Sequence, residues 1–147
     1  MDGGTASLAV WFDAFVTNVD RTARNPNLLM WHGKPWLIDH GAALYFQHGW
    51  RRGGEANPAA RFAQVKSHVL LPWATELGEA DRLARGRLGE SEFRRILGMV
   101  PDGWLEDAAG GETPESLREA YGVYLTQRLA QTAGFVEEAE RAHAELV

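Results

Sequence analysis

The sequence predicts a mainly α-helical fold with one small β-hairpin. Apolar residues near both ends of the chain recur at the i, i+3, i+4 spacing of amphipathic helices. Two short apolar, aromatic-rich runs between residues 28 and 38 are separated by a connection that contains Gly33, which is typical of a hairpin. Gly and Pro divide much of the rest into short segments, as expected for short helices joined by loops.

Composition limits the classes of function. The 147 residues suit one domain, and a hydrophobic fraction of 45% is enough for a core. The absence of cysteine excludes disulfides and thiolate chemistry and fits a cytoplasmic protein. A formal net charge of −5 argues against nucleic acid or an anionic membrane as a partner. No long uncharged apolar run or signal-like segment is visible, so we expect no membrane association.

The first predicted element is a helix over residues 5–19, capped by Thr5 or Ser7. It would end beside Asp20. Its predicted apolar face consists of Leu8, Trp11, Phe12, Phe15 and Val19.

The hairpin is predicted to run from Leu28 to Trp31, turn at residues 32–34, and return from Pro35 to Ile38. Trp31 and Trp36 near the turn are interpreted as a cross-strand aromatic pair rather than a platform for a ligand.

The remaining chain is predicted to be helical over 59–147, after a Gly-rich irregular loop within residues 42–58. Thr113-Pro114-Glu115 indicates the start of a long helix, and Gly134 indicates its end or a bend. One face of the segment after residue 59 is predicted to be buried through Phe62, Val65, Val69 and Trp73.

Candidate chemistry lies in residues 20–41. Asp20 and Asn25 are separated by four residues, and Asp39 follows the hairpin with Gly41 two positions later. Mg²⁺ prefers carboxylate and amide oxygens. Phosphoryl transfer needs one Asp to orient the accepting hydroxyl and an Asn and a second Asp to hold the metal. A loop joined by a hairpin to Asp39 could bring all three side chains to one point.

Each residue alone also has an ordinary explanation. Asp20 could cap a helix end, Asn25 could form a turn, and Asp39 could simply follow a strand. Arg24 is equally suited to contact a nucleotide phosphate or to carry surface charge. For Arg21 we prefer a structural role, either as a surface charge or as a partner for Asp39 or Asp13. His40 and His48 lack clustered partners, so no zinc site is predicted.

Together, residues 18–29 (NVDRTARNPNLL) and 36–46 (WLIDHGAALYF) resemble the HipA-like kinases, and more distantly the phosphoinositide kinases. Asp20, Asn25 and Asp39 look like the catalytic loop and metal-binding Asp-Phe-Gly segment of the protein-kinase-like fold, with His40 in place of the usual Phe. The resemblance is most specific over residues 11–48. It implies ATP and Mg²⁺ as cofactors and a protein Ser or Thr hydroxyl as acceptor, with Asp20 catalytic and Asn25 and Asp39 as metal ligands.

The resemblance covers the C-terminal lobe of such a kinase. No Gly-x-Gly-x-x-Gly motif occurs, and Lys34 and Lys66 both follow the proposed catalytic loop. We therefore expect residues 1–147 to form a single C-terminal-lobe domain with the N-lobe absent. The N-lobe could belong to a longer polypeptide or to a partner chain. Alternatively, the chain is a non-catalytic helical interaction module derived from a truncated kinase.

Overall fold

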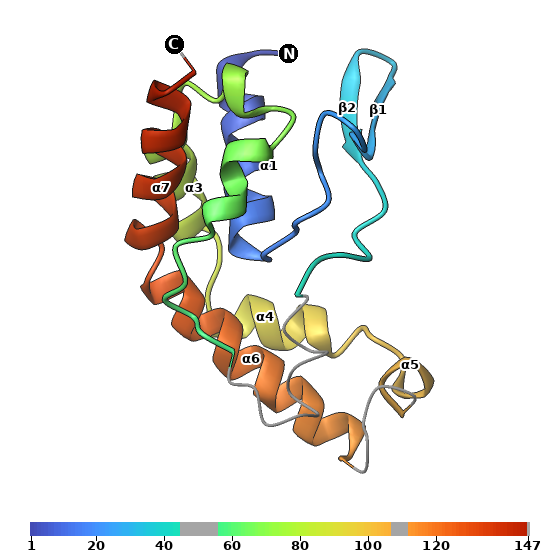
Figure 1. The fold of residues 1–147 in the computed structure, drawn as a ribbon. Coiled ribbons are helices and arrows are strands. Elements are labelled where there is room, and N and C mark those ends of the chain that lie inside the picture. Colours follow the sequence, from blue (N-terminus) through green and yellow to red (C-terminus); the bar gives the residue numbers. More distant parts are fainter. Residues whose placement is uncertain (45–55, 107–111, 147) are drawn as a thin grey trace.

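A computed structural model describes residues 1–44, 56–106 and 112–146. These residues form a mainly helical fold with a two-stranded antiparallel sheet (Figure 1). No helix in these ranges has the length and apolarity needed to cross a membrane. The elements are α1 (Gly3–Phe15), β1 (Leu28–Trp31), β2 (Lys34–Leu37), the 3-10 helices η1 (Ala63–Ser67) and η2 (Leu71–Trp73), α3 (Leu77–Arg85), α4 (Glu90–Leu97), α5 (Asp102–Glu106), α6 (Pro114–Ala130) and α7 (Ala133–Ala144).

Helix α1 lies at the centre of the core. It packs against α3, α7 and η2, while α4 and α5 pack against α6 (Figure 1). The Trp11 ring of α1 stacks on Phe15 with a centroid separation of 5.0 Å and meets Phe135 of α7 edge-on at 5.8 Å. Phe15 in turn stacks on Phe93 of α4 at 5.9 Å. These aromatic contacts join the first helix to α4 and α7.

The start of α1 differs from the prediction. Oδ1 of Asp2 accepts the backbone N–H of Thr5 at 2.9 Å, so Asp2 is the cap and the helix begins at Gly3. Ser7, the other predicted cap, is buried inside the helix, and its Oγ accepts the N–H of Glu76 at 2.8 Å. A carboxylate before the first turn caps the free N–H groups as well as a hydroxyl does.

The end of α1 also corrects the prediction, because the helix stops at Phe15 rather than near residue 19. Thr17 adopts a left-handed backbone with a φ of 53°. The N–H of Thr17 donates to the Ala14 carbonyl at 3.4 Å, and the N–H of Asn18 donates to the Asp13 carbonyl at 2.8 Å. These two bonds form a Schellman motif, which satisfies the last carbonyls and redirects the chain toward Asp20.

The predicted apolar face of α1 is only partly correct. Trp11 and Phe15 are buried, but three of the five predicted residues keep more than a third of their surface: Leu8, Phe12 and Val19. The helix packs closely through small side chains instead, namely Ala6, Ala9 and Ala14. Because α1 has apolar residues on both its buried and its exposed side, their spacing alone could not show which side is buried.

The hairpin is present, with a shorter turn than predicted. His32 and Gly33 have φ values of 48° and 73°, and Lys34 already belongs to β2. Two consecutive residues with positive φ are characteristic of a type I′ turn, whose twist matches that of the strands. The register pairs Leu28 with Leu37, Leu29 with Trp36, Met30 with Pro35, and Trp31 with Lys34.

This register does not pair the two tryptophans directly, although it places them diagonally on the same face of the hairpin. Trp36 lies opposite Leu29, and Trp31 lies opposite Lys34. Both indole side chains are more than half exposed. Leu28 alone in β1 is partly buried against the core, so the hairpin is attached to the domain mainly through its open end.

The later helices follow the sequence signals closely. Oγ1 of Thr113 accepts the N–H of Ser116 at 3.2 Å, and Pro114 occupies the first turn of α6, which confirms the predicted start. The helix is interrupted between α6 and α7, and Gly134 lies in the first turn of α7. Proline at the first helical position and a hydroxyl cap act locally, which explains why they could be read directly.

Trp73 is the exception among the predicted core residues of this region. Phe62 and Val65 are buried, but Trp73 is 54% exposed. The segment forms two 3-10 helices, so the 3.6-residue period used for the prediction does not apply across it. Residues 45–55 of the predicted Gly-rich loop, including His48, lie outside the described residues, as do residues 107–111.

Candidate active site

Asp20 and Asn25 lie side by side on the segment between α1 and β1. Nδ2 of Asn25 donates a hydrogen bond to Oδ2 of Asp20 at 2.6 Å. A tight backbone turn supports this contact, because Thr22 and Asn25 exchange two N–H to carbonyl bonds of 3.1 Å each. Among the described residues, neither the Asn25 amide oxygen nor Oδ1 of Asp20 accepts a hydrogen bond, and both are oxygen types that Mg²⁺ prefers.

The same loop is held to the segment before η2. The N–H of Val69 donates to the Arg21 carbonyl at 3.0 Å, and Thr22 forms an isolated antiparallel bridge with His68. These bonds lie directly next to Asp20 in the sequence. The backbone next to Asp20 is therefore bonded to the segment that contains His68 and Val69, although it has no regular secondary structure.

Asp39 follows β2 in an unusual backbone conformation. Its φ is 49°, in the left-handed region that Asp tolerates better than most residues. Its Oδ1 accepts the N–H of Gly41 at 3.4 Å, and its carbonyl accepts Nδ2 of Asn27 at 3.5 Å. The side chain is exposed. Among the described residues, no hydrogen bond joins Asp39 to Asp20 or Asn25.

Arg21 connects the two parts of the candidate site. Its guanidinium donates through Nη1 to the Asn27 carbonyl, just before β1, and to the Ile38 carbonyl, just after β2, at 3.3 Å for the latter. Nε and Nη2 donate to the two carboxylate oxygens of Asp13. Arg21 is only 1% exposed. The predicted partnership with Asp13 is confirmed, whereas the alternative of a surface charge is wrong.

Asp13 is the centre of a buried polar cluster. Besides Arg21, its Oδ1 accepts from Nδ2 of Asn18 at 3.0 Å, and its Oδ2 lies 2.9 Å from Nε2 of His68. We call Asp13, Asn18, Arg21 and His68 the Asp13 cluster. All four residues are at most 6% exposed.

The hydrogen bonds of His68 define its tautomer. Nδ1 accepts the backbone N–H of Leu70 at 3.0 Å, so the proton is on Nε2, which donates to Asp13. Burial raises the pKa of Asp13, but the hydrogen bonds from His68, Arg21 and Asn18 more than offset it, and the pKa lies below its ordinary value. The cluster therefore combines one carboxylate, one guanidinium and a neutral imidazole.

Arg24 and His40, also near the predicted site, are both exposed. In the described part of the chain, Arg24 forms no ion pair, so its contact with a nucleotide phosphate stays a prediction. The His40 ring meets Phe12 of α1 edge-on, with centroids 5.7 Å apart. His40 therefore holds the segment after β2 against α1.

The donor set of the predicted metal site consists of two carboxylates and one amide. Carboxylate and amide oxygens suit Mg²⁺, which keeps several waters and needs few protein ligands. Across residues 1–44, 56–106 and 112–146, no three His, Asp or Glu side chains form a group that could hold a metal. The set of Asp20, Asn25 and Asp39 is not a group of this kind, because one of its three members is an amide. Asn25 and Asp20 are in direct contact.

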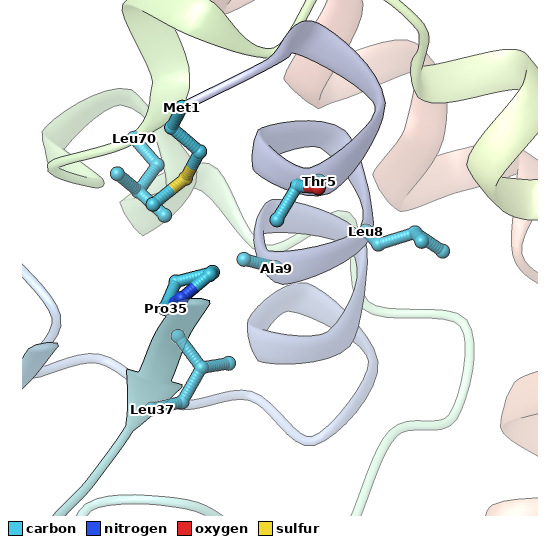
Figure 2. Close-up of a pocket in the computed structure, with 7 residues that line it drawn as sticks. All are labelled: Met1, Thr5, Leu8, Ala9, Pro35, Leu37 and Leu70. Atoms are coloured by element: carbon cyan, nitrogen blue, oxygen red, sulfur yellow. The ribbon is translucent and has the colours of Figure 1, made fainter. Parts of the chain in front are cut away.

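A pocket of about 220 Å³ lies beside α1, away from these residues. Figure 2 shows Pro35 and Leu37 of β2 on one side, Thr5 and Ala9 of α1 on the other, and Leu70 at one end. The lining is mainly apolar. None of Asp20, Arg24, Asn25 or Asp39 contributes to it, so the pocket belongs to the junction of hairpin and helix rather than to the candidate site.

Two members of the Asp13 cluster were not identified from the sequence. Asn18 is placed by the Schellman motif, and His68 comes from a segment with no motif of its own. One signal was available, because Asp13 lies between Val10 and Ala14 on the buried side of α1. A carboxylate in that position requires buried donors.

Comparison of the chain with protein-family models, with curated proteins and with solved structures gave no match. Three features of these residues point to a function: the contact between Asp20 and Asn25, the backbone of Asp39, and the contacts of Arg21 with both ends of the hairpin.

Proposed function

We propose that this chain is the C-terminal lobe of a HipA-like kinase, which transfers the γ-phosphoryl group of ATP to a hydroxyl with the help of Mg²⁺. One observation carries the proposal. Asp20 and Asn25 are in hydrogen-bond contact on a loop that Arg21 ties to the residue preceding Asp39. This arrangement supports the predicted use of all three side chains in one site.

In this proposal, Asp20 orients the accepting hydroxyl and takes its proton as the oxygen attacks the γ-phosphorus. The bond to the β–γ bridging oxygen breaks, and ADP leaves. Asn25 and Asp39 hold Mg²⁺ against the phosphates, which neutralises their charge. Arg24 contacts a phosphate oxygen. The acceptor is a Ser or Thr hydroxyl of a protein, and an N-lobe outside these 147 residues covers the nucleotide.

The test is Mg²⁺-dependent binding of ATP to the purified chain, measured by calorimetry at several Mg²⁺ concentrations. Asp39→Ala should abolish the dependence on Mg²⁺ while the circular dichroism spectrum stays unchanged. Glu119→Gln on α6 is the control, because this exposed side chain carries the same charge far along the chain from the site. An Asp39→Ala variant that binds ATP with unchanged Mg²⁺ dependence would sink the proposal.

A second candidate function is a helical interaction module without chemistry. The hairpin favours it, because it lies at the edge of the fold beside α1 (Figure 1) and four of its apolar side chains are more than half exposed: Leu29, Met30, Trp31 and Trp36. Such clusters often mark protein contacts. This candidate predicts no phosphoryl transfer by the chain under any Mg²⁺ or ATP concentration. Transfer of labelled phosphate to a Ser- and Thr-containing protein would exclude it.

A further inference from the structure

Arg21 makes its contacts at the two positions where the hairpin enters and leaves the domain. The Asn27 carbonyl accepts from Arg21 Nη1 and also from the N–H of Ile38 at 3.0 Å. The Ile38 carbonyl accepts from the same Nη1. One buried guanidinium therefore bonds to the residue before β1 and to the residue before Asp39.

Both ends of the hairpin need such support. Asn27 and Asp39 have φ values of 44° and 49°, a left-handed conformation that costs free energy in residues other than Gly, although less in Asn and Asp than in most. Residues in this conformation persist where the surroundings fix them, and they occur preferentially at functional sites. The Asn27 side chain adds a bond to the Asp39 carbonyl. The conformation of Asp39 thus depends on contacts made one residue before it.

Asp13 in turn fixes the guanidinium. Both of its oxygens accept from Arg21, while Asn18 and His68 occupy the remaining acceptor positions. A planar guanidinium with a paired carboxylate has little freedom to rotate. Because all four residues are buried, water cannot take over these bonds.

We propose that Arg21 is a positioning residue for the metal ligand Asp39. Its backbone follows Asp20 directly, while its side chain holds the strand end that carries Asp39. Arg21 therefore sets the distance between the carboxylate of Asp20, which orients the hydroxyl, and that of Asp39, which binds the metal. Arg21 touches neither ATP nor metal, and its effect reaches Mg²⁺ only through the backbone of Ile38 and Asp39. The role for the metal rests on the function proposed above.

The test compares Arg21→Lys with Arg128→Lys. Arg128 is a matched control, because it is also buried and, among the described residues, donates to backbone carbonyls outside the site, those of Ala14, Phe15, Pro58 and Ala60. The first readout is hydrogen exchange of the Ile38 amide without any ligand. The second is the Mg²⁺ concentration needed for half-maximal ATP binding.

Lysine keeps the charge but cannot bond to Asp13 and both carbonyls at once. In Arg21→Lys, we expect exchange of the Ile38 amide to accelerate more than that of core amides such as Val10. We also expect the required Mg²⁺ concentration to rise by roughly 10- to 100-fold, as for other residues that orient metal ligands. Arg128→Lys should accelerate exchange evenly and leave the Mg²⁺ requirement unchanged.

The two readouts separate the failure of this inference from that of the proposed function. Unchanged Ile38 exchange in Arg21→Lys overturns the positioning role, whatever the ligand results. Faster exchange with an unchanged Mg²⁺ requirement overturns its link to the metal, while the kinase proposal stands. Absence of Mg²⁺-dependent ATP binding in the wild type overturns the proposed function, and with it the metal role, whereas the exchange data still decide whether Arg21 holds the strand end.

If Arg21→Lys does not fold, the wild-type protein provides the decisive measurement. An Arg21 side chain bonded to Asp13, Asn27 and Ile38 should show an Nε–H resonance protected from solvent exchange at neutral pH. The Arg128 Nε–H, which donates to the Phe15 carbonyl at 3.2 Å, serves as the reference for a buried guanidinium. Rapid exchange at Arg21 beside slow exchange at Arg128 would overturn the positioning role.

Discussion

Nε2 of His68 donates a hydrogen bond of 2.9 Å to Oδ2 of Asp13, across a separation of 55 positions in the sequence. The bond joins the turn before η2 to the middle of α1. Because Asp13 also accepts from Arg21, the contact links the helical core to the loop that carries Asp20. The candidate site is therefore supported by buried charge rather than by regular secondary structure.

The first prediction concerns pH. The pKa of Asp13 is lowered below its ordinary value of 3.8, because the hydrogen bonds of the cluster outweigh the effect of burial. A carboxyl with a lowered pKa in the folded state stabilises the protein above its unfolded pKa, and this contribution disappears as the pH falls through the folded pKa. We expect the free energy of unfolding in urea to fall below about pH 4 in part through this group.

The variant Asp13→Asn measures how much the Asp13 carboxylate contributes to the free energy of unfolding. At pH 7 it should lower the free energy of unfolding by about 3–5 kcal/mol, because Arg21 stays buried without its counterion. The difference from the wild type should shrink as the pH falls below the folded pKa. Asp102→Asn is the control, since that exposed Asp pairs with Arg118 at the surface and should cost less than about 1 kcal/mol. A difference between wild type and Asp13→Asn that does not change with pH would contradict the prediction.

The second prediction separates catalysis from binding and rests on the proposed function. Asp20→Asn keeps the size of the side chain but removes the carboxylate that takes the hydroxyl proton. We expect the rate of phosphoryl transfer to fall by about 10²- to 10⁴-fold, with little change in the affinity for ATP and Mg²⁺. The measurement pairs single-turnover transfer, in whichever form of the protein is active, with calorimetric binding. Equal losses in rate and affinity would assign Asp20 to the metal instead.

The third prediction concerns the hairpin turn. Gly33 has a φ of 73° and open space where an added Cβ would lie, so the only obstacle to Gly33→Ala is the backbone conformation. We expect a loss of about 1 kcal/mol in hairpin stability, seen as faster amide exchange in β1 and β2. Gly103→Ala is the matched control, because Gly103 also has open space but lies inside helix α5. It should be neutral or stabilising. Similar losses in both variants would contradict the assigned turn.

The fourth prediction distinguishes a core aromatic residue from a surface one. Phe135 is 1% exposed and packs against Trp11, and its ring centroid lies 4.6 Å from the guanidinium carbon of Arg128. Phe135→Ala should lower the free energy of unfolding by about 3–5 kcal/mol. Trp73→Ala should lower it less, by roughly 1 kcal/mol, because that side chain is 54% exposed and buries less apolar surface. Thermal or urea unfolding checks both, and a large effect at Trp73 would restore the position predicted for it from the sequence.

Much of the local structure could be predicted because its causes are local. Thr113 and Pro114 mark the start of α6 whatever surrounds them. The apolar runs of the hairpin were recognised as well, but its turn was predicted one residue too long. The conformation of His32, a non-Gly residue with positive φ, is a consequence of strand twist that residue type does not reveal.

The candidate site divides in the same way. Asp20, Asn25 and Asp39 were selected by chemistry and spacing, and the structure brings the first two into contact. The support for the site could be predicted only in part. The sequence offered Asp13 as one of several partners for Arg21, but the burial of Arg21 depends on Asp13 and His68, which come from other parts of the chain.

By itself, then, the sequence determined the helical class, the hairpin, and the polar residues on either side of it, because capping, turn formation and periodicity act over a few residues. Only the tertiary structure decided where α1 ends, which of its faces is buried, and how Arg21 joins the loop of Asp20 to the strand end before Asp39. The physical reason is that a buried charge must find its partners wherever the fold places them. Those partners are set by packing across the whole domain, not by neighbouring residues.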